Sequence, residues 1–379
     1  STSATAAGTI TTATLTNYGN ATINSNALTT VNVSGASGTL GITAGALTTA
    51  TVSTLALNTN GLAGTNAMTI DADYTTLNID NSTAASTIAD IITAGATAVN
   101  VSGDAAITFT DQNLTNAALA ITVTNTAGAS FGTTAIGTAA TFTGGSGADA
   151  VVLGATTKTI TMGDGNDTVT YGGAVGVGGS VAAGGGTGDK IIMTAAQAVA
   201  ADDNSTFNST FTGFETLRLT TVAAAGTTTN LAGLNNVNKV ELMLGGNHAT
   251  SAIISELVDG GTVETYATSI GITVQIDNAA FNSADDLNFG INSAAIVTTG
   301  ALVAANVETL NIIANDATAT GGTAVTNVIT ALTADSATTI NVSGNNGLTI
   351  TAATGSVAVT TFDASGVVAN GVADTGTLL

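Results

Sequence analysis

The stretch FTGGSGADAVVLGATTKTITMGDGNDTVTY, residues 142–171, contains two glycine-aspartate motifs in a chain that is otherwise poor in charge. The motifs are GGSGAD, which ends at Asp149, and GDGND, which ends at Asp167. Glycines let the main chain turn tightly, and the apolar residues that follow each motif are typical of a strand entering a core. A turn-and-strand unit that recurs at a short step predicts a repeat architecture.

A nine-residue pattern, G-G-x-G-x-D-x-U-x with U a large apolar residue, describes these motifs. The first motif, residues 144–152, matches it fully. The second motif, residues 162–170, has Met162 in place of the first glycine. The third motif, residues 184–192, has Thr187 in place of the third glycine. Three copies in so short a stretch indicate more than incidental glycine-rich turns, since the pattern is that of a calcium-binding repeat.

Calcium takes six to eight hard oxygen ligands, which aspartates and turned glycine carbonyls supply. Two nine-residue repeats separate Asp149 from Asp167 and return the chain to the same edge one coil higher, so we expect these aspartates to stack with calcium between them. Asp189 follows Asp167 after two such repeats and a short insertion. The half-turn at 155–159 lacks the motif, so we expect calcium along one edge only. The predicted metal-binding residues are Gly145, Gly147, Asp149, Gly163, Asp164, Gly165, Asp167, Gly185 and Asp189.

The chain is strongly acidic, with 25 Asp and Glu against four Lys and Arg and a net charge of −21. This balance excludes a nucleic-acid partner, which needs a basic surface, and disfavours anionic lipid. No run is long and apolar enough to insert into a membrane. A divalent cation would compensate the charge. Further acid pairs are compatible with calcium, although such pairs are more often solvated turns: Asp71 and Asp73, Asp202 and Asp203, Asp285 and Asp286.

Three near copies of one segment alternate apolar and polar residues and end at Ser-Gly, which predicts short half-buried strands closed by turns. In the first copy, Val31 and Val33 are expected to face the core and Asn32 to face outward. The copies are TTVNVSG (29–35), TAVNVSG (97–103) and TTINVSG (338–344).

A second strand family carries four of the five glutamates, spaced at roughly 22 to 26 residues with a last gap about twice as long. Its members are FETLRL (214–219), KVELML (239–244), VETYAT (263–268) and VETLNI (307–312). A strand-rich step of about 22 residues predicts one coil of a parallel β-solenoid, with irregular insertions. The all-β class follows, with about 17 coils stacked at about 4.8 Å. The alternative is a string of antiparallel sandwiches, for which an aromatic content of 3% is less natural.

Two segments favour short helical excursions from the coils. Val325, Val328, Ile329 and Leu332 lie at i, i+3, i+4 and i+7. The segment TAAQAVAADD, residues 194–203, is rich in alanine.

At the three glycine-aspartate motifs the chain resembles the RTX-type surface-layer (S-layer) proteins of Gram-negative bacteria, of the Caulobacter kind. The resemblance implies a calcium-bearing β-solenoid that is exported by a type I system and assembles into a lattice on the cell surface. It also implies copies of the chain as partners, with cell-surface polysaccharide as a further candidate. The departures at Met162 and Thr187 would weaken individual sites. We expect solenoid over residues 1–141, an RTX-like calcium-binding β-roll segment over 142–192 and further solenoid over 193–379.

Two other classes of function compete with a self-assembling coat. An enzyme is not expected, because the sole histidine, His248, excludes an H-E-x-x-H zinc site and no serine lies in a G-x-S-x-G turn. An adhesin or carbohydrate-binding stalk would share most of this composition. Sugar-binding faces usually present aromatic platforms, and this chain has no Trp and four Tyr.

Overall fold

The structure is a computed structural model, and it describes residues 6–43, 52–64, 67–114, 116, 118–173, 178–202, 204–221, 227–234, 236–243, 251–315, 325–356 and 358–368. The fold is nearly all β, with parallel strands stacked as a solenoid of about 14 turns. The predicted fold class is therefore confirmed, with fewer coils than expected. The chain forms two compact units. Unit 1 comprises Ser1–Lys190 and Ser209–Gly213, and unit 2 comprises Ile191–Asn208 and Phe214–Leu379.

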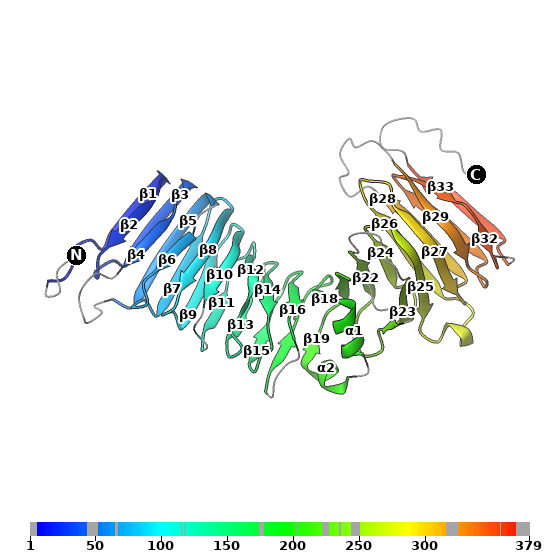
Figure 1. The fold of residues 1–379 in the computed structure, drawn as a ribbon, viewed down its shortest axis with the longest axis horizontal. Helices are drawn as coiled ribbons and strands as arrows, with labels where there is room; N and C mark the ends of the chain where they lie inside the picture. The colour runs from blue at the N-terminus through cyan, green and yellow to red at the C-terminus, as the bar shows by residue number, and fades with distance from the viewer. Residues whose placement is uncertain are drawn as a thin grey trace. The chain divides into compact units, whose positions relative to one another are not determined.

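Unit 1 contains two walls of parallel strands, in which each strand pairs with the next strand of its own wall (Figure 1). The first wall consists of β1 (Thr12–Tyr18), β3 (Thr30–Ser37), β5 (Thr54–Gly64), β7 (Thr76–Asn81), β9 (Ala98–Gly103), β11 (Ala120–Val123), β13 (Thr141–Thr143), β15 (Thr159–Thr161), β17 (Ser180–Ala182) and β19 (Phe211–Thr212). The second wall consists of β2 (Ala21–Asn24), β4 (Leu40–Thr43), β6 (Ala67–Ile70), β8 (Ser86–Thr93), β10 (Ile107–Leu114), β12 (Ala129–Ile136), β14 (Ala150–Leu153) and β16 (Thr168–Tyr171). The strand β18 (Lys190–Met193) is divided between the units, because Lys190 belongs to unit 1 and residues 191–193 belong to unit 2.

Unit 2 repeats this arrangement with longer strands. One wall consists of β20 (Thr216–Leu219), β22 (Lys239–Leu242), β24 (Thr262–Thr265), β26 (Asp286–Asn292), β28 (Thr309–Asn315), β30 (Thr339–Gly344) and β33 (Thr361–Val367). The other consists of β21 (Thr228–Asn230), β23 (Ala252–Leu257), β25 (Ser269–Ile276), β27 (Thr298–Ala305), β29 (Thr326–Thr333), β31 (Gly347–Ile350) and β32 (Ala353–Thr354).

The register between paired strands shows that the coils differ in length. A coil is of intermediate length where Asn78 of β7 pairs with Asn100 of β9. It is shorter where Ala150 of β14 pairs with Thr168 of β16, and longer where Asn311 of β28 pairs with Asn341 of β30. The predicted repeat with irregular insertions is therefore confirmed.

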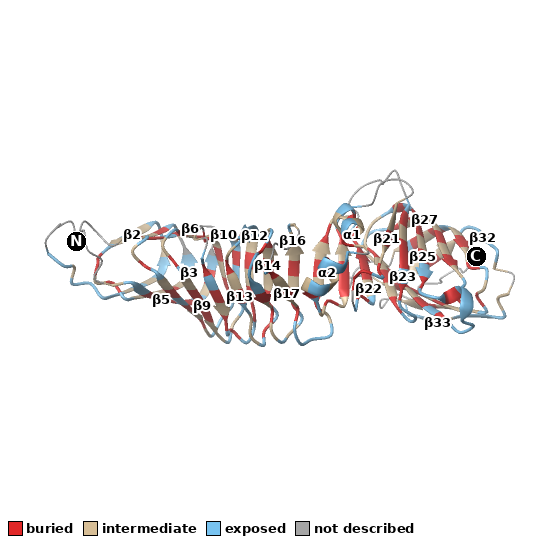
Figure 2. Cartoon of the chain, turned by 90° about the horizontal axis from the view of Figure 1, so that it is seen from below, coloured by how far each residue is buried: buried red, intermediate tan, exposed pale blue. Residues whose placement is uncertain are grey.

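Each unit has a narrow core of aliphatic side chains stacked coil on coil, seen as buried bands along the strands in Figure 2. In unit 1 one register column is Leu55, Leu77, Val99, Ile121 and Phe142, none more than 1% exposed. In unit 2 a corresponding column is Val240, Val263, Phe289, Ile312 and Val342. Full burial of such a side chain contributes about 1.5–3 kcal/mol, so the columns are the main source of stability.

The three NVSG segments form strands β3, β9 and β30, as predicted; β9 and β30 end at the glycine, whereas β3 continues past Gly35 to Ser37. Val31 and Val33 are buried, whereas Asn32 is partly exposed on the outer face. The four segments of the glutamate family contribute β20, β22, β24 and β28, which lie in one wall of unit 2.

One of the two predicted helical excursions is present. The helix α1 (Ala195–Ala201) begins after a capping box, in which the Gln197 amide donates to Thr194 Oγ1 at 3.2 Å and the Thr194 amide donates to Gln197 Oε1 at 2.8 Å. The described helical elements also include α2 (Ser205–Thr210) and η1 (Ala279–Phe281). In the described ranges, no helix has the length and apolar character needed to cross a membrane.

The helical expectation for Val325 to Leu332 is wrong, because residues 326–333 form strand β29. Val328 pairs with Thr298 of β27 and with Thr349 of β31. Two neighbouring strands supply main-chain hydrogen bonds to this segment, and its β-branched residues suit a pleated wall, so tertiary pairing overrides the helical spacing.

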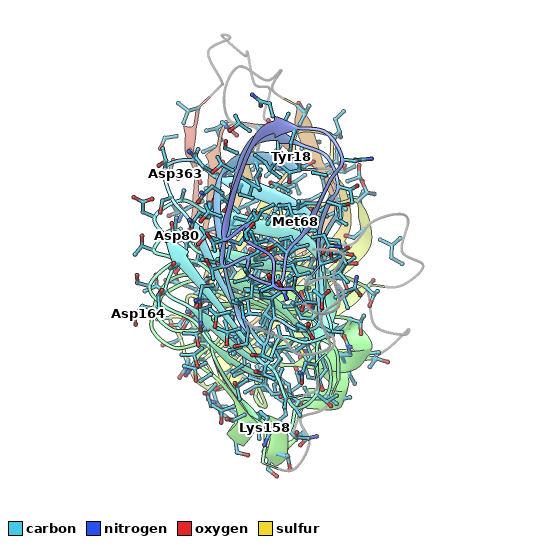
Figure 3. The ribbon with its side chains drawn as sticks, turned by 90° about the vertical axis from the view of Figure 1, so that its left-hand side faces the viewer. Tyr18, Met68, Asp80, Lys158, Asp164 and Asp363 are labelled. Atoms are coloured by element: carbon cyan, nitrogen blue, oxygen red, sulfur yellow. The ribbon has the colours of Figure 1, made fainter. Side chains whose placement is uncertain are left out.

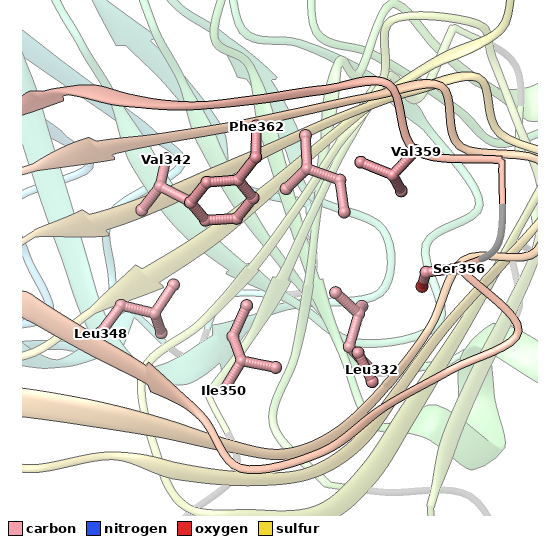
Figure 4. Close-up of a pocket in the computed structure, with 9 residues that line it drawn as sticks. Leu332, Val342, Leu348, Ile350, Ser356, Val359 and Phe362 are labelled. Atoms are coloured by element: carbon pink, nitrogen blue, oxygen red, sulfur yellow. The ribbon is translucent and has the colours of Figure 1, made fainter. Parts of the chain in front are cut away.

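The core of unit 2 widens at its last described coils (Figure 4). An apolar cavity of about 300 Å³ lies there, between the strands β29, β30, β31 and β33. Its lining residues are Leu332, Ile340, Val342, Leu348, Ile350, Ala353, Ser356, Val359 and Phe362. Phe362 is 48% exposed, so this coil closes its core less completely than the coils before it.

Candidate metal centre

Three predicted ligands, Asp149, Asp167 and Asp189, form a column that we term the aspartate column. They directly precede β14, β16 and β18. The register that pairs Ala150 with Thr168 also aligns Asp149 with Asp167, so the predicted stacking of the first two motifs is confirmed. The Lys190 amide donates to the Asp167 carbonyl at 2.8 Å. This hydrogen bond places Asp189, the residue before Lys190, one coil beyond Asp167.

Each aspartate caps a main-chain amide of the preceding coil. Oδ1 of Asp149 accepts a hydrogen bond from the Ala129 amide at 2.8 Å. Oδ1 of Asp167 accepts one from the Asp149 amide at 2.7 Å, and Oδ1 of Asp189 one from the Asp167 amide at 2.7 Å. All three side chains are at most 1% exposed, so these short charge-assisted bonds are shielded from water.

The second carboxylate oxygen of Asp167 is buried and accepts no hydrogen bond from the described residues; that of Asp149 has no well-formed one, although the Gly145 amide also interacts with the Asp149 carboxylate. A buried carboxylate oxygen without a partner is costly, because it has lost its water. A proton, a cation or a bound water can satisfy such an oxygen.

Burial raises the pKa of Asp149 to about 6 and that of Asp167 to about 7, and hydrogen bonds from main-chain amides partly offset the effect. The pKa of Asp167 is raised further by three neighbouring carboxylates, those of Asp149, Asp189 and Asp164. Burial also raises the pKa of Asp189. No basic side chain is among the causes for Asp149 or Asp167, so the ionised form of each carboxylate is less favourable than that of an exposed aspartate.

The glycines of the motifs allow a close approach of main chains. Gly163 and Gly184 have φ of +100° and +103°, in the region that favours glycine. A Cβ on Gly163 would clash with the carbonyl oxygen of Gly145, and one on Gly184 with the carbonyl oxygen of Gly163. The motifs therefore stack main chain on main chain, which concentrates carbonyl oxygens beside the aspartate column.

The third motif is shifted by one residue against the other two. Asp164 forms a parallel bridge with Gly185, and the Gly185 amide donates to the Gly163 carbonyl at 2.8 Å. Gly184 therefore lies beside Gly163 and not beside Met162, the position that pattern matching assigns to it. Met162 stands where the pattern has its first glycine. Its side chain is fully buried, so it contributes to the packing of the core.

Asp164 does not join the buried column. It is exposed, and in Figure 3 it lies at the margin of the coils, on the same side as Asp80. Lys158 lies at a different corner of unit 1 in the same view. Of the four acids predicted as ligands, the structure brings three together and places Asp164 outside them.

The residues of the aspartate column fit calcium better than a metal held by side chains alone. In the ranges that the structure describes, no three aspartate, glutamate or histidine side chains lie close enough together to hold a metal ion. A cation at the column would therefore take most of its oxygens from main-chain carbonyls and water, which calcium accepts. The partnerless oxygens of Asp149 and Asp167 would supply the charged ligands.

A contrasting cluster of charge lies on one wall of unit 2, and sequence reasoning missed it. Glu241 and Glu264 are paired in register on β22 and β24. Lys239 Nζ lies 2.6 Å from Glu264 Oε2 and 3.4 Å from Glu241 Oε1, and Arg218 Nε lies 2.6 Å from Glu241 Oε2. The hydroxyl of Tyr266 donates to Glu264 Oε2 at 2.9 Å. These stacked carboxylates are neutralised within the chain.

The remaining described acids that the sequence offered as calcium ligands form no metal-holding cluster of three: Asp71, Asp73, Asp202, Asp285 and Asp286. Asp71 accepts a hydrogen bond from the Asp73 amide at 3.1 Å, as in an ordinary turn. Asp203 and His248 lie outside the described residues. No protein-family model matches the chain, and no curated protein is significantly similar to it.

Proposed function

We propose that the protein is a secreted structural β-solenoid whose coils are bridged by calcium and which assembles with copies of itself into a cell-surface layer or filament. The observation that carries this proposal is the aspartate column, with two buried carboxylate oxygens that have no partner among the described residues. The resemblance of the three glycine-aspartate motifs to RTX-type S-layer proteins supports it.

In this proposal calcium acts as a clamp between coils. Asp149, Asp167 and Asp189 hold it together with carbonyl oxygens of the glycine-aspartate motifs. The ion removes the desolvation cost of the carboxylates and links adjacent coils, so binding stabilises the folded state by mass action. No catalytic role is proposed for these residues.

The outer faces of the walls support self-assembly, because they present rows of uncharged polar side chains. Their side chains form hydrogen-bonded ladders across successive coils. The amide of Asn58 donates to Asn32 at 2.8 Å, that of Asn100 to Asn78 at 2.8 Å, and that of Asn341 to Asn311 at 2.8 Å. Rigid polar walls of this kind suit repeated contacts between identical, acidic chains.

The alternative is a calcium-braced adhesin or carbohydrate-binding stalk. Tyr74 is buried, with its hydroxyl donating to the Leu28 carbonyl at 2.9 Å. Tyr18, Tyr171 and Tyr266 are each only partly exposed. The described tyrosines therefore form no open aromatic platform for a sugar ring, and we prefer the coat.

Electron microscopy of the purified chain, first with calcium and then with a chelator, tests the proposal. Ordered sheets or filaments that form with calcium and dissolve with chelator are expected. Isolated rods in both conditions would favour the stalk.

A matched pair of variants ties assembly to the aspartate column. Asp167→Asn keeps the hydrogen-bond acceptor and removes the charge, and it is expected to abolish calcium-dependent assembly. Asp104→Asn removes one exposed charge whose Oδ1 accepts from the Thr83 amide, and it is expected to assemble normally. Assembly of Asp167→Asn at the wild-type calcium concentration would contradict the proposed clamp.

A further inference from the structure

Lys158 is an exposed basic residue that forms no ion pair with the described part of the chain. Of the other Lys and Arg residues, Arg218 and Lys239 are held in ion pairs. Lys190 is only partly exposed. In Figure 3 Lys158 lies at a corner of unit 1, away from Asp164. A chain with a net charge of −21 thus presents one exposed basic side chain within the described ranges, at a defined corner.

The main chain holds Lys158 in place. Its amide donates to Thr156 Oγ1 at 3.2 Å, and the same hydroxyl donates to the Lys158 carbonyl at 3.3 Å. The next coil adds a hydrogen bond from the Ser180 amide to the Lys158 carbonyl, at 3.2 Å. Thr156 is buried, so it anchors this turn to the core. The half-turn at 155–159, which lacks the calcium motif, therefore presents its cation from a fixed main chain.

Unit 2 presents the opposite charge at one of its corners, which we term the acidic corner. Its exposed carboxylates are those of Asp259, Asp277 and Asp286. The Asp286 amide donates to Asp259 Oδ1 at 2.7 Å. The Asp277 amide donates to the carbonyl of Leu257, two residues before Asp259, at 2.7 Å. These hydrogen bonds bring the three acids to the same corner of adjacent coils.

A fourth carboxylate, that of Asp285, lies inside the acidic corner. It is 2% exposed, and its Oδ2 has no hydrogen-bond partner among the described residues. Glu308 Oε2 reaches the same turn, where it accepts a hydrogen bond from the Asp285 amide at 2.9 Å. Within the described ranges, no three acidic side chains lie close enough together to hold a metal ion. The corner therefore offers a cation a strongly negative field and not a coordination site.

Phe281 lies in the connection between Asp277 and Asp285. It is 88% exposed, more than any other large apolar side chain in the described residues. Its amide donates to the Asn278 carbonyl at 2.9 Å, which fixes the turn that carries the ring. A phenyl ring attracts an ammonium group to its face, and it can also cover the alkyl stem of a lysine. The acidic corner therefore suits a lysine side chain better than an inorganic ion.

We propose that Lys158 of one copy docks on the acidic corner of a second copy. Its ammonium group lies among the three exposed carboxylates, and its stem lies against Phe281. The inference rests on the proposed self-assembly and names one contact of it. Opposite local charges bring the copies together although both are acidic overall. Because the two patches differ, a pair of copies keeps one free patch of each kind, so the contact continues from copy to copy.

Carbodiimide crosslinking of the wild-type protein, assembled in calcium, tests the contact directly. The reagent joins an amine to a carboxylate in an amide bond and takes up the water that is lost. A mixture of isotope-labelled and unlabelled chains identifies bonds between copies by mass spectrometry. We expect Lys158 to be joined to an exposed carboxylate of the acidic corner of a different copy. The contact would be overturned if Lys158 formed no bond, or formed bonds only within one copy or only to other carboxylates.

Variants measure how much the contact contributes to assembly. Lys158→Gln removes the cation and Phe281→Ala removes the ring, and each is expected to raise the critical concentration for assembly in calcium by roughly tenfold. Ala295→Glu, in the exposed turn before β27, makes the same change in net charge as Lys158→Gln and is expected to assemble like the wild type. Circular dichroism establishes that all three variants are folded. A wild-type critical concentration in Lys158→Gln would overturn the contact.

The wild-type chain separates this inference from the proposed function. Sheets or filaments that dissolve in chelator, without a bond from Lys158 to the acidic corner, would overturn the contact and leave the coat standing. Crosslinked copies that never grow into sheets or filaments would support the contact and contradict the coat. A wild-type chain that neither assembles nor crosslinks would overturn both.

Discussion

The aspartate column of unit 1 and the paired glutamates of unit 2 both place carboxylates close together. They differ in how the repulsion between these charges is relieved. Both stack carboxylates on adjacent coils in register. Glu241 and Glu264 share Lys239, and Arg218 holds Glu241 as well. Asp149 and Asp167 are buried, and each has an oxygen without a partner among the described residues.

The size of the repulsion shows why the difference matters. Two carboxylates one coil apart, at about 4.8 Å, repel by about 3 kcal/mol at an effective dielectric constant of about 20. The hydrogen bonds that cap the column each contribute about 1.5–3 kcal/mol. Without a counter-charge the two effects nearly cancel. Lys239 and Arg218 neutralise the glutamate stack of unit 2, whereas the buried second oxygens of Asp149 and Asp167 have no such partner among the described residues.

The largest effect is expected from removing the close main-chain contact of unit 1 without touching a carboxylate. Gly163→Ala places a Cβ against the Gly145 carbonyl at a φ of +100°. We expect a loss of about 3 kcal/mol or more, measured by urea unfolding. Gly154→Ala, where a Cβ meets only ordinary contacts, should change stability by less than about 0.5 kcal/mol. Equal midpoints for the two variants would refute the described stacking.

The second-largest effect is expected when folding stability is measured against pH in the presence of a chelator, because only the aspartate column should respond. The folded pKa of Asp167, about 7, lies above the ordinary value of 3.8, so the folded state holds protons that the unfolded chain has released. Stability should therefore fall as pH rises from 5 to 8, on the order of 3 kcal/mol for Asp149 and Asp167 together. Saturating calcium should flatten the profile. A calcium-free chain more stable at pH 8 than at pH 5 would contradict this expectation.

Neutralising one member of the aspartate column should stabilise the calcium-free protein. Asp167→Asn keeps the acceptor for the Asp149 amide and removes a buried charge, so we expect a gain of about 2 kcal/mol at pH 8 in chelator. The same variant should lose the stabilisation that calcium gives to the wild type. Asn327 already caps the Val297 amide at 2.9 Å while fully buried, which shows that a cap needs no charge. A destabilised calcium-free variant would favour a purely structural role for the aspartate.

The smallest change in stability is expected in unit 2, where neutralising a carboxylate should destabilise the protein instead of stabilising it. Glu241→Gln leaves Arg218 and Lys239 with one carboxylate fewer and should cost about 1 kcal/mol, because both cations are partly solvated. The loss should be the same with and without calcium. A calcium-dependent change in this variant would remove the distinction between the two stacks.

The strands and the aspartate column could be predicted because their signals are local. Val31 and Val33 alternate with polar neighbours within one strand, and the spacing of Asp149 and Asp167 equals one coil. The register of Gly184 could not be predicted, since the extra residue of the third motif lies between the bridge at Gly185 and the aspartate.

The misread segment and the alignment of Asp285 with acids of the neighbouring coils depend on distant residues. β29 is a strand because β27 and β31 pair with it, and the apolar spacing of the segment contains no trace of them. Asp259, Asp285 and Glu308 come from three unlike turns at unequal offsets along the chain. Only the coil lengths, which vary with each insertion, bring them into line.

The capping bonds of the aspartate column have a direction, which gives the stack a mechanical polarity. Each carboxylate holds an amide of the coil before it, so a coil is complete only while the next coil remains in place. A pulling force on the C-terminal side of unit 1 would therefore peel coils one at a time. Each coil as long as the one that joins Asp149 to Asp167 would release about 60 Å of extended chain.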